Sequence, residues 1–221
     1  MRKVLKNKKG IVGIEAAIVL IAFIIVAAAL SYVVINMGFY ITQKTKDTMQ
    51  SGLDESLSAL QPDGLAAGKT NDEGYIEWII FPVKLSVGKE GLDLKKEAIV
   101  VSVYLPNATL LNIYNGVYMD SVEVDCDVLI MRLSEACGMN ETDMAMFVIY
   151  NGDSDTVLEP TEKAFLIVHL NSTVADVPGA RHAIADYETF KIEVKGAKGS
   201  ALTVVRTAPG GMPKNTYVNM G

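Results

Sequence analysis

The chain has 221 residues, half of them hydrophobic, and a formal charge of −6. This length allows one domain of ordinary size plus an extension. Residues 1–10 hold five of the 20 basic residues and none of the 26 acidic ones, so the rest of the chain is strongly acidic and poorly suited to nucleic acid.

The N-terminal segment is a basic stretch that ends at Gly10 and leads into a long apolar run. The roughly 20 residues from Ala16 to Ile35 carry no charge, and as a helix they span about 30 Å, the thickness of a bilayer core. Their favourable transfer free energies outweigh the cost of one carboxylate, Glu15, at the edge. We therefore expect membrane insertion, with the basic residues in the cytoplasm and the C-terminal bulk outside.

The residues around Gly10 resemble the processing signal of type IV pilins and archaellins (archaeal flagellins), in which Lys-Lys-Gly precedes an apolar run. The segment 36–48 and the ending 201–209 are also similar to archaellins. The resemblance implies that residues 1–10 are a type III signal peptide. It also implies that a prepilin-type signal peptidase cuts between Gly10 and Ile11, leaving the apolar helix on the mature chain.

Glu15 would be the fifth residue of the mature chain, where pilins carry glutamate and many archaellins do not. A carboxylate that enters a dry helical core needs a partner, because an unpaired buried charge is very costly. We expect a salt bridge between Glu15 and the free ammonium of Ile11 on a neighbouring subunit. The alternative is that Glu15 lies at the membrane surface.

A helix that is apolar on all sides must be covered all round, by lipid or by other helices. Residues 11–60 are predicted to form this helix, continuous to about residue 57, with its first part packed against copies of itself in a filament core. The second part, from Thr42 to Leu57, is expected to lie on its own domain. An apolar stripe supports this packing, with members at three- and four-residue spacings: Met49, Leu53, Leu57 and Leu60.

Residues 61–74 are rich in Gly, Asn and Asp and are expected to form a hinge or loop. Beyond it the pattern changes to short strands without a convincing amphipathic helix between them. We predict an α+β chain in which an immunoglobulin-like antiparallel β-sandwich over residues 75–221 follows the long hydrophobic helix. The predicted strands are Tyr75–Phe81, Val83–Val87, Ala98–Leu105, Val122–Leu133, Met146–Tyr150, Ala164–Leu170, Thr189–Lys195 and Ala201–Thr207.

Two of these strands have distinctive patterns. Residues 190–195 alternate between apolar and charged, which predicts a strand with a wet outer face. Residues 164–170 are apolar almost throughout and suit a central strand or a surface buried between subunits. Pro82 is expected to mark a sheet edge or a break between two strands.

A cation site is one interpretation of the acidic loop after residue 150. Oxygen-bearing side chains alternate at Asn151, Asp153 and Asp155, with Glu162 following, and calcium prefers such oxygen ligands. Because archaellins carry a metal site in the outer domain, the resemblance implies a structural Ca²⁺ or Mg²⁺ at these four residues, with no other cofactor required. The alternative is a loop whose side chains hydrogen-bond their own backbone.

Other candidate sites concern modification. The only two cysteines, Cys126 and Cys137, are either one disulfide across a short loop or two small buried thiols. Asn107, Asn140 and Asn171 begin Asn-x-Ser/Thr triplets, and the resemblance implies a glycan on at least one of them. No arrangement of catalytic residues is recognisable, so we assign none and expect no enzyme activity.

The archaellin resemblance implies a structural subunit of an extracellular filament that polymerises through its N-terminal helix and serves swimming. The chain would lie in the membrane before assembly, and its partners would be other copies, the signal peptidase, and the archaellum motor with its assembly ATPase. Two alternatives stay open, an archaeal type IV adhesion pilin and a membrane-anchored surface protein that never polymerises.

Overall fold

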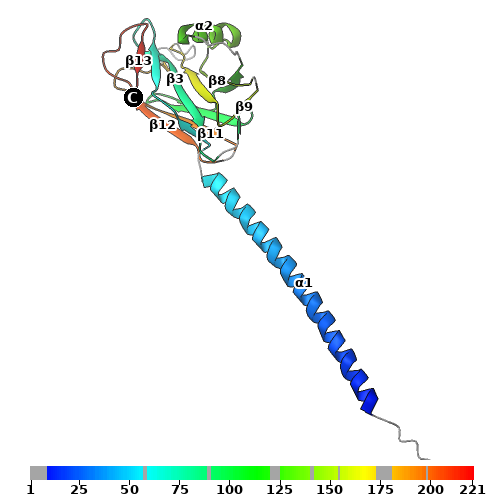
Figure 1. The fold of residues 1–221 in the computed structure, drawn as a ribbon. Helices are drawn as coiled ribbons and strands as arrows, with labels where there is room; N and C mark the ends of the chain where they lie inside the picture. Colours follow the sequence, from blue (N-terminus) through cyan, green and yellow to red (C-terminus); the bar gives the residue numbers. More distant parts are fainter. Residues whose placement is uncertain are drawn as a thin grey trace, which may run out of the picture. The chain divides into compact units, whose positions relative to one another are not determined.

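A computed structural model of the chain describes residues 9–56, 59–88, 91–119, 125–139, 142–153, 155–172, 181–197 and 199–221. The chain divides into two compact units, Met1–Leu53 and Asp54–Gly221. A helix makes up the first unit and a β domain the second (Figure 1).

Helix α1 runs from Lys9 to Ser56 without interruption. Its 48 residues give a length of about 72 Å. The sequence permits this length because no proline occurs before Pro62. The continuous helix is as predicted, but it ends at Ser56, and Leu60 belongs to a strand and is buried in the β domain. Leu60 is therefore not part of the helical stripe, and the packing of residues 42–57 on the domain stays a prediction.

The β domain contains two main sheets and a short two-stranded ribbon. The larger sheet has the order β13-β2-β3-β10-β8-β7, with β1 also paired to β3. Its strands are β1 (Leu60–Pro62), β2 (Ala67–Thr70), β3 (Ile76–Leu85), β7 (Tyr114–Tyr118), β8 (Met144–Tyr150), β10 (Lys163–His169) and β13 (Tyr217–Asn219).

The smaller sheet has the order β12-β11-β5-β6. Its strands are β5 (Ile99–Tyr104), β6 (Thr109–Leu110), β11 (Thr189–Gly196) and β12 (Leu202–Thr207), and the ribbon pairs β4 (Leu92–Asp93) with β9 (Val157–Leu158). Among the described strands, β7 and β8 pair in parallel and the other pairs are antiparallel. The α+β class, with an apolar helix followed by a mainly antiparallel β domain, is confirmed, although the parallel pair was not expected.

The two sheets enclose the main hydrophobic core. Alternate residues of β8 point into it, and Phe147 is fully buried there with its ring edge-on to Tyr114, centroids 5.6 Å apart. From the smaller sheet, β11 contributes Phe190 and Ile192, while its intervening charged residues face outward. The alternation predicted for residues 190–195 is therefore confirmed.

The larger sheet is covered on both faces. The second face carries its own cluster, in which Trp78 of β3 and Ile167 of β10 pack against Leu133 from a helix. A strand covered on both sides should be apolar throughout, as β10 is. The prediction of a central strand at residues 164–170 is confirmed, since β10 lies between β3 and β8.

The helix that covers this second face is α2, Cys126–Cys137, where the sequence predicted a strand over 122–133 (Figure 1). The strand prediction is wrong for residues 126–133, and residues 120–124 lie outside the described part. Buried Ile130 and Leu133 follow helical spacing, and Gly138 ends the helix in the left-handed conformation, with φ 65°. This segment resembles a buried strand in sequence because it contains β-branched residues such as Val128 and Ile130.

The segment 61–74, expected to be a hinge or loop, instead contributes two strands to the larger sheet. β1 pairs with residues 83–85 of β3, and β2 pairs with residues 76–80 of the same strand. Of the two alternatives predicted for Pro82, a sheet edge or a break between strands, the break is wrong because β3 runs through this residue. Pro82 lies between the stretch of β3 that pairs with β2 and the stretch that pairs with β1. Its carbonyl accepts a hydrogen bond from the backbone amide of Asp63. A proline, which has no N–H to donate, is tolerated at such a position between two paired stretches.

Asp63 ties the start of the domain to two central strands. Its carboxylate lies 2.6 Å from the ammonium groups of both Lys84 in β3 and Lys163 in β10, and its side chain is 13% exposed. The hydrogen bond from Lys163, followed by that from Lys84, lowers the pKa of Asp63 below its ordinary value. This stabilisation is present above the ordinary carboxyl pKa and is lost as the pH falls through the lowered one.

The disulfide prediction is contradicted by α2. Cys126 and Cys137 lie at opposite ends of this helix and are free thiols. Eleven residues of helix separate their Cα atoms by about 16 Å, whereas a disulfide needs roughly 4.4–6.8 Å.

We therefore expect two free thiols in the exported protein. Iodoacetamide added to the denatured, unreduced chain should attach two adducts, counted by intact mass spectrometry. The variant with both cysteines changed to serine is the control and should gain none. A wild-type chain that takes up adducts only after reduction would contradict the helix.

Candidate functional site: the apolar helix

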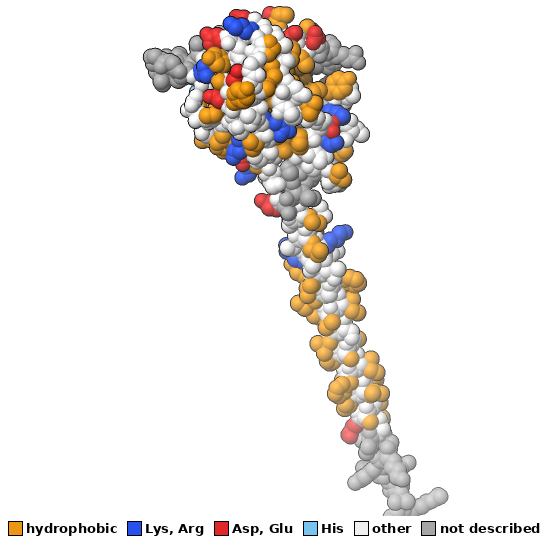
Figure 2. All heavy atoms as spheres, turned by 90° about the vertical axis from the view of Figure 1, so that its left-hand side faces the viewer, with side chains coloured by type: hydrophobic (Ala, Val, Ile, Leu, Met, Phe, Trp, Pro, Cys, Tyr) orange, Lys and Arg blue, Asp and Glu red, His pale blue; other side chains and the backbone are white. Residues whose placement is uncertain are grey.

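The surface of α1 is exposed along most of its length. All described side chains from residue 13 to residue 53 are exposed. They include large apolar groups such as Ile14, Phe23 and Ile35. The side of α1 seen in Figure 2 carries hydrophobic side chains along most of its length. The helix is long and apolar enough to span a membrane, with a mean hydropathy of 3.0 over its most apolar 18-residue window.

Burying one such side chain is worth roughly 1.5–3 kcal/mol, so about ten of them represent tens of kcal/mol. Hydrated α1 is therefore unstable relative to any state that covers it. Three hydroxyl groups of the helix do little to oppose burial. Ser31, Thr42 and Thr48 each donate to the carbonyl four residues earlier, all at 2.8 Å. Their polarity is satisfied within the helix.

Glu15 is the only charged residue between Gly13 and Gln43. Its side chain is exposed and makes no ion pair within the described part of this chain. Gly10 and Ile11 lie inside α1, and their side chains are outside the described set. The salt bridge to Ile11 requires a second, processed copy, so it stays a prediction.

The acidic loop between β8 and β10 satisfies its own backbone. The two carboxylate oxygens of buried Glu162 accept from the amides of Asp153 and Glu159, at 3.3 and 3.0 Å. Asp155 accepts from the amide of Val157 at 2.7 Å. Within the described ranges, no group of three or more His, Cys, Asp and Glu side chains is placed to hold a metal ion.

The predicted cation ligands Asn151, Asp153, Asp155 and Glu162 thus do not fit an ion in this arrangement. The alternative of a loop that bonds its own backbone describes the geometry. Calcium or magnesium binding stays a prediction without support from the positions of these side chains.

The three glycosylation triplets differ in accessibility. Asn107 is exposed in the turn between β5 and β6, where the amide of Leu105 donates to the carbonyl of Ala108 at 2.8 Å. Asn171 is half-buried, and its backbone N–H donates to the carboxylate of Asp143 at 2.8 Å. Asn140 lies outside the described residues. Asn107 is therefore the acceptor that the described fold presents best.

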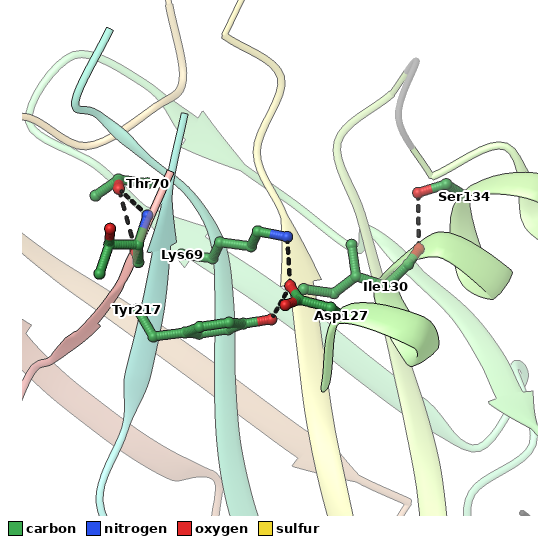
Figure 3. Close-up of polar contacts among 7 residues, drawn as sticks. Lys69, Thr70, Asp127, Ile130, Ser134 and Tyr217 are labelled. Carbon is green, nitrogen blue, oxygen red and sulfur yellow. Dashed lines mark hydrogen bonds and ion pairs between the residues drawn. The ribbon is translucent and has the colours of Figure 1, made fainter. Parts of the chain in front are cut away.

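Sequence reasoning missed a polar tie that fastens α2 to the sheet (Figure 3). Asp127 in the first turn of α2 binds the ammonium of Lys69 in β2 at 2.7 Å and accepts from the hydroxyl of Tyr217 in β13 at 2.8 Å. The hydrogen bond from Lys69 and then that from Tyr217 lower the pKa of Asp127. The three residues are far apart in sequence, so no local pattern could have revealed the tie.

Comparison with known proteins places these features in one family. The family model described as "Archaeal-type flagellin" matches residues 10–206. "Probable flagellin 1" of Aeropyrum pernix is 42% identical over 98% of this chain and 100% of that protein. "Probable flagellin 1" of Archaeoglobus fulgidus is 35% identical, over 93% of this chain and 92% of that protein.

Two solved structures share the fold. The crystal structure of archaeal flagellin FlaB1 from Methanocaldococcus jannaschii has a TM-score of 0.57 at 15% identity, and covers 73% of this chain and 95% of its own. A chain of the archaeal flagellum of Methanospirillum hungatei strain JF1 has a TM-score of 0.52 at 24% identity, and covers 95% of this chain and 99% of its own. With a family model that spans most of its residues and a relative 42% identical over nearly its whole length, the chain belongs to the archaeal-type flagellins.

Proposed function

We propose that this chain is the structural subunit of an extracellular archaeal flagellum (archaellum) filament, assembled by packing its apolar helix against copies of itself. The observation that carries this proposal is the exposure of α1 on all sides. The chain is a structural protein and not an enzyme, because it belongs to a family of structural filament subunits. Its contribution to swimming is mechanical, through a filament that is rotated from its base.

Two successive environments can cover α1. Lipid covers it first, because the apolar run is long enough to cross a bilayer. Neighbouring helices cover it after assembly, and they can approach closely where the helix carries small residues, such as Gly13 and Ala16. The β domain has its own closed core, so it can fold outside the membrane while α1 is still in lipid.

The adhesion-pilus alternative differs in use and not in assembly. The relatives of this chain described above are named flagellins, which favours a swimming filament over an adhesive pilus. The pilin-like feature that remains is Glu15. The third alternative, a monomeric surface anchor, leaves α1 in lipid permanently.

Deletion of the gene tests the function directly. We expect the cells to lose both the filament and swimming, and to regain both when the gene is restored. Electron microscopy and motility tracking measure these outcomes. Cells that still swim but no longer adhere would favour the pilus, and filaments that persist without this chain would contradict the proposal.

Processing by a membrane peptidase is the step that prepares the chain for assembly. Five basic residues before Gly10 would hold the leader in the cytoplasm, and the family match begins at Gly10. We propose cleavage between Gly10 and Ile11 by a prepilin-type signal peptidase. Export into the filament and its rotation would then involve an assembly ATPase and a motor as separate partners.

N-terminal sequencing of the filament protein checks this cleavage. We expect Ile11 as the first residue, and we expect Gly10→Val to leave the leader attached and the chain in the membrane. Gly13→Val serves as control, because it adds the same bulk three residues beyond the cut and should be processed. A mature chain that begins at Met1 or near Ser31 would contradict the assignment.

Cleavage would also create the partner for Glu15. The new ammonium of Ile11 is the closest source of positive charge in sequence, and a second copy could bring it to the carboxylate within a dry core. Breaking a buried pair costs about 3–5 kcal/mol, because the remaining charge is left without a partner. Glu15→Gln should therefore impair assembly without impairing processing.

We expect Glu15→Gln to raise the critical concentration for polymerisation on the order of 100-fold or more, since each 1.4 kcal/mol corresponds to about tenfold. Sedimentation of filaments from purified, processed protein measures it. Glu55→Gln is the matched control, because Glu55 lies at the polar end of α1. An unchanged critical concentration for Glu15→Gln would instead place this carboxylate at the membrane surface.

Glycosylation stays a proposal for the exposed turn at Asn107. The mature chain measured for the cleavage experiment should exceed the mass of the bare polypeptide, and Asn107→Gln should remove one glycan. A mature chain of bare polypeptide mass would contradict it.

A further inference from the structure

One face of the second half of α1 carries groups that can form hydrogen bonds. Tyr32, Asn36 and Tyr40 follow one another at four-residue spacing, so they lie above one another on the helix surface. At 100° per residue the same face is apolar nearer the N-terminus, where it carries Ile14, Ile18, Ala22, Ile25 and Ala29. We call the three residues 32, 36 and 40 the polar stripe.

The side chains of the polar stripe are exposed and make no hydrogen bond with the other described residues. The hydroxyl groups of Ser31, Thr42 and Thr48 are satisfied by carbonyls of the helix itself. Tyr32 and Tyr40 are 70% and 67% exposed, and the side chain of Asn36 is exposed between them. Within the described part of the chain, no hydrogen bond joins any of the three to another group.

An unpaired amide is harmless in water and costly in a dry core. The apolar run from Ile11 to Ile41 is about 46 Å long as a helix, whereas a bilayer core is about 30 Å thick. If residues 16–35 occupy the bilayer core, Asn36 lies at its outer boundary, where water and lipid headgroups reach it. Lipid therefore leaves the amide hydrated, and packing against other helices is the step that would dehydrate it.

We propose that Asn36, flanked by Tyr32 and Tyr40, fixes the axial register between α1 helices of neighbouring subunits by hydrogen bonding to the polar stripe of a second copy. The occupant is a second copy because α1 packing is the assembly contact of the proposed function, on which this inference rests. Its chemistry is also self-complementary, since an amide and a phenol each donate and accept.

The purely apolar surface below the stripe constrains sliding weakly, because any apolar group covers isoleucine equally well. A shift of one turn, about 5.4 Å, would exchange the facing amide for a phenol, and a shift of two turns toward the N-terminus would leave the amide facing apolar side chains. A single buried asparagine is known to specify register in packed helices at some cost in stability. Asn36 is therefore a specificity-determining residue of the filament core.

The test compares filaments of Asn36→Leu with those of Val34→Leu, which alters an apolar residue on the opposite face. Both variants should be inserted, processed and exported as the wild type is, because the amide is hydrated in lipid. Electron cryomicroscopy then measures helical rise and twist. We expect one symmetry for the wild type and Val34→Leu, and two or more for Asn36→Leu.

Asn36→Leu filaments with the single wild-type symmetry would overturn the proposal. Loss of membrane insertion in Asn36→Leu alone would also overturn it, since the amide would then act in lipid. If Asn36→Leu is processed but forms no filament, Asn36→Gln decides: a restored filament supports the amide contact, and continued failure overturns it. Absence of filaments from the wild-type chain would instead count against the proposed function.

Discussion

A helix that is apolar on all sides cannot remain in water, and this constraint governs the rest of the molecule. The described side chains of α1 from residue 13 to residue 53 are all exposed. The cover must come from lipid or from other copies. A subunit that moves from a membrane to an extracellular filament meets both environments in turn, and the same apolar surface serves in each.

The β domain has its own closed core, so the transfer of α1 from lipid to a filament does not require it to unfold. Its two sheets close one core between them, and α2 closes a second cluster on the outer face of the larger sheet. Ion pairs join elements at the surface of the domain. Asp63, directly after β1, binds lysines of β3 and β10, and Asp127 joins α2 to β2. With its core complete, the domain can present a polar outer surface wherever α1 is placed.

The sequence reveals these elements where one physical pattern dominates. The helix was predictable because no proline or charge cluster interrupts the apolar run, and β11 because its side chains alternate strictly. α2 was missed because Val128 to Leu133 is apolar enough to resemble a buried strand, and only the spacing of Ile130 and Leu133 indicates a helix. Short strands such as β1 depend on pairing with β3, which no local signal encodes.

Some candidate sites can likewise be predicted from the sequence, whereas others depend on the fold. The apolar helix and Glu15 are evident from the order of residues alone. Whether Cys126 meets Cys137, or whether Glu162 has free oxygens, depends on the local fold: a helix separates the thiols, and backbone amides occupy the carboxylate. Asn36 is visible in the sequence, but only the structure shows that it lacks a hydrogen-bond partner among the described residues, in contrast to the satisfied hydroxyls of Ser31 and Thr42.

The most direct measurement of the central claim is the environment of α1 inside an assembled filament. Electron cryomicroscopy of filaments grown from purified, processed protein should show α1 helices from neighbouring copies at the centre, in side-chain contact at interaxial distances of about 8–10 Å and without lipid between them. Helices that stay separated by lipid or water, or filaments that still form after residues 11–53 are deleted, would contradict the account.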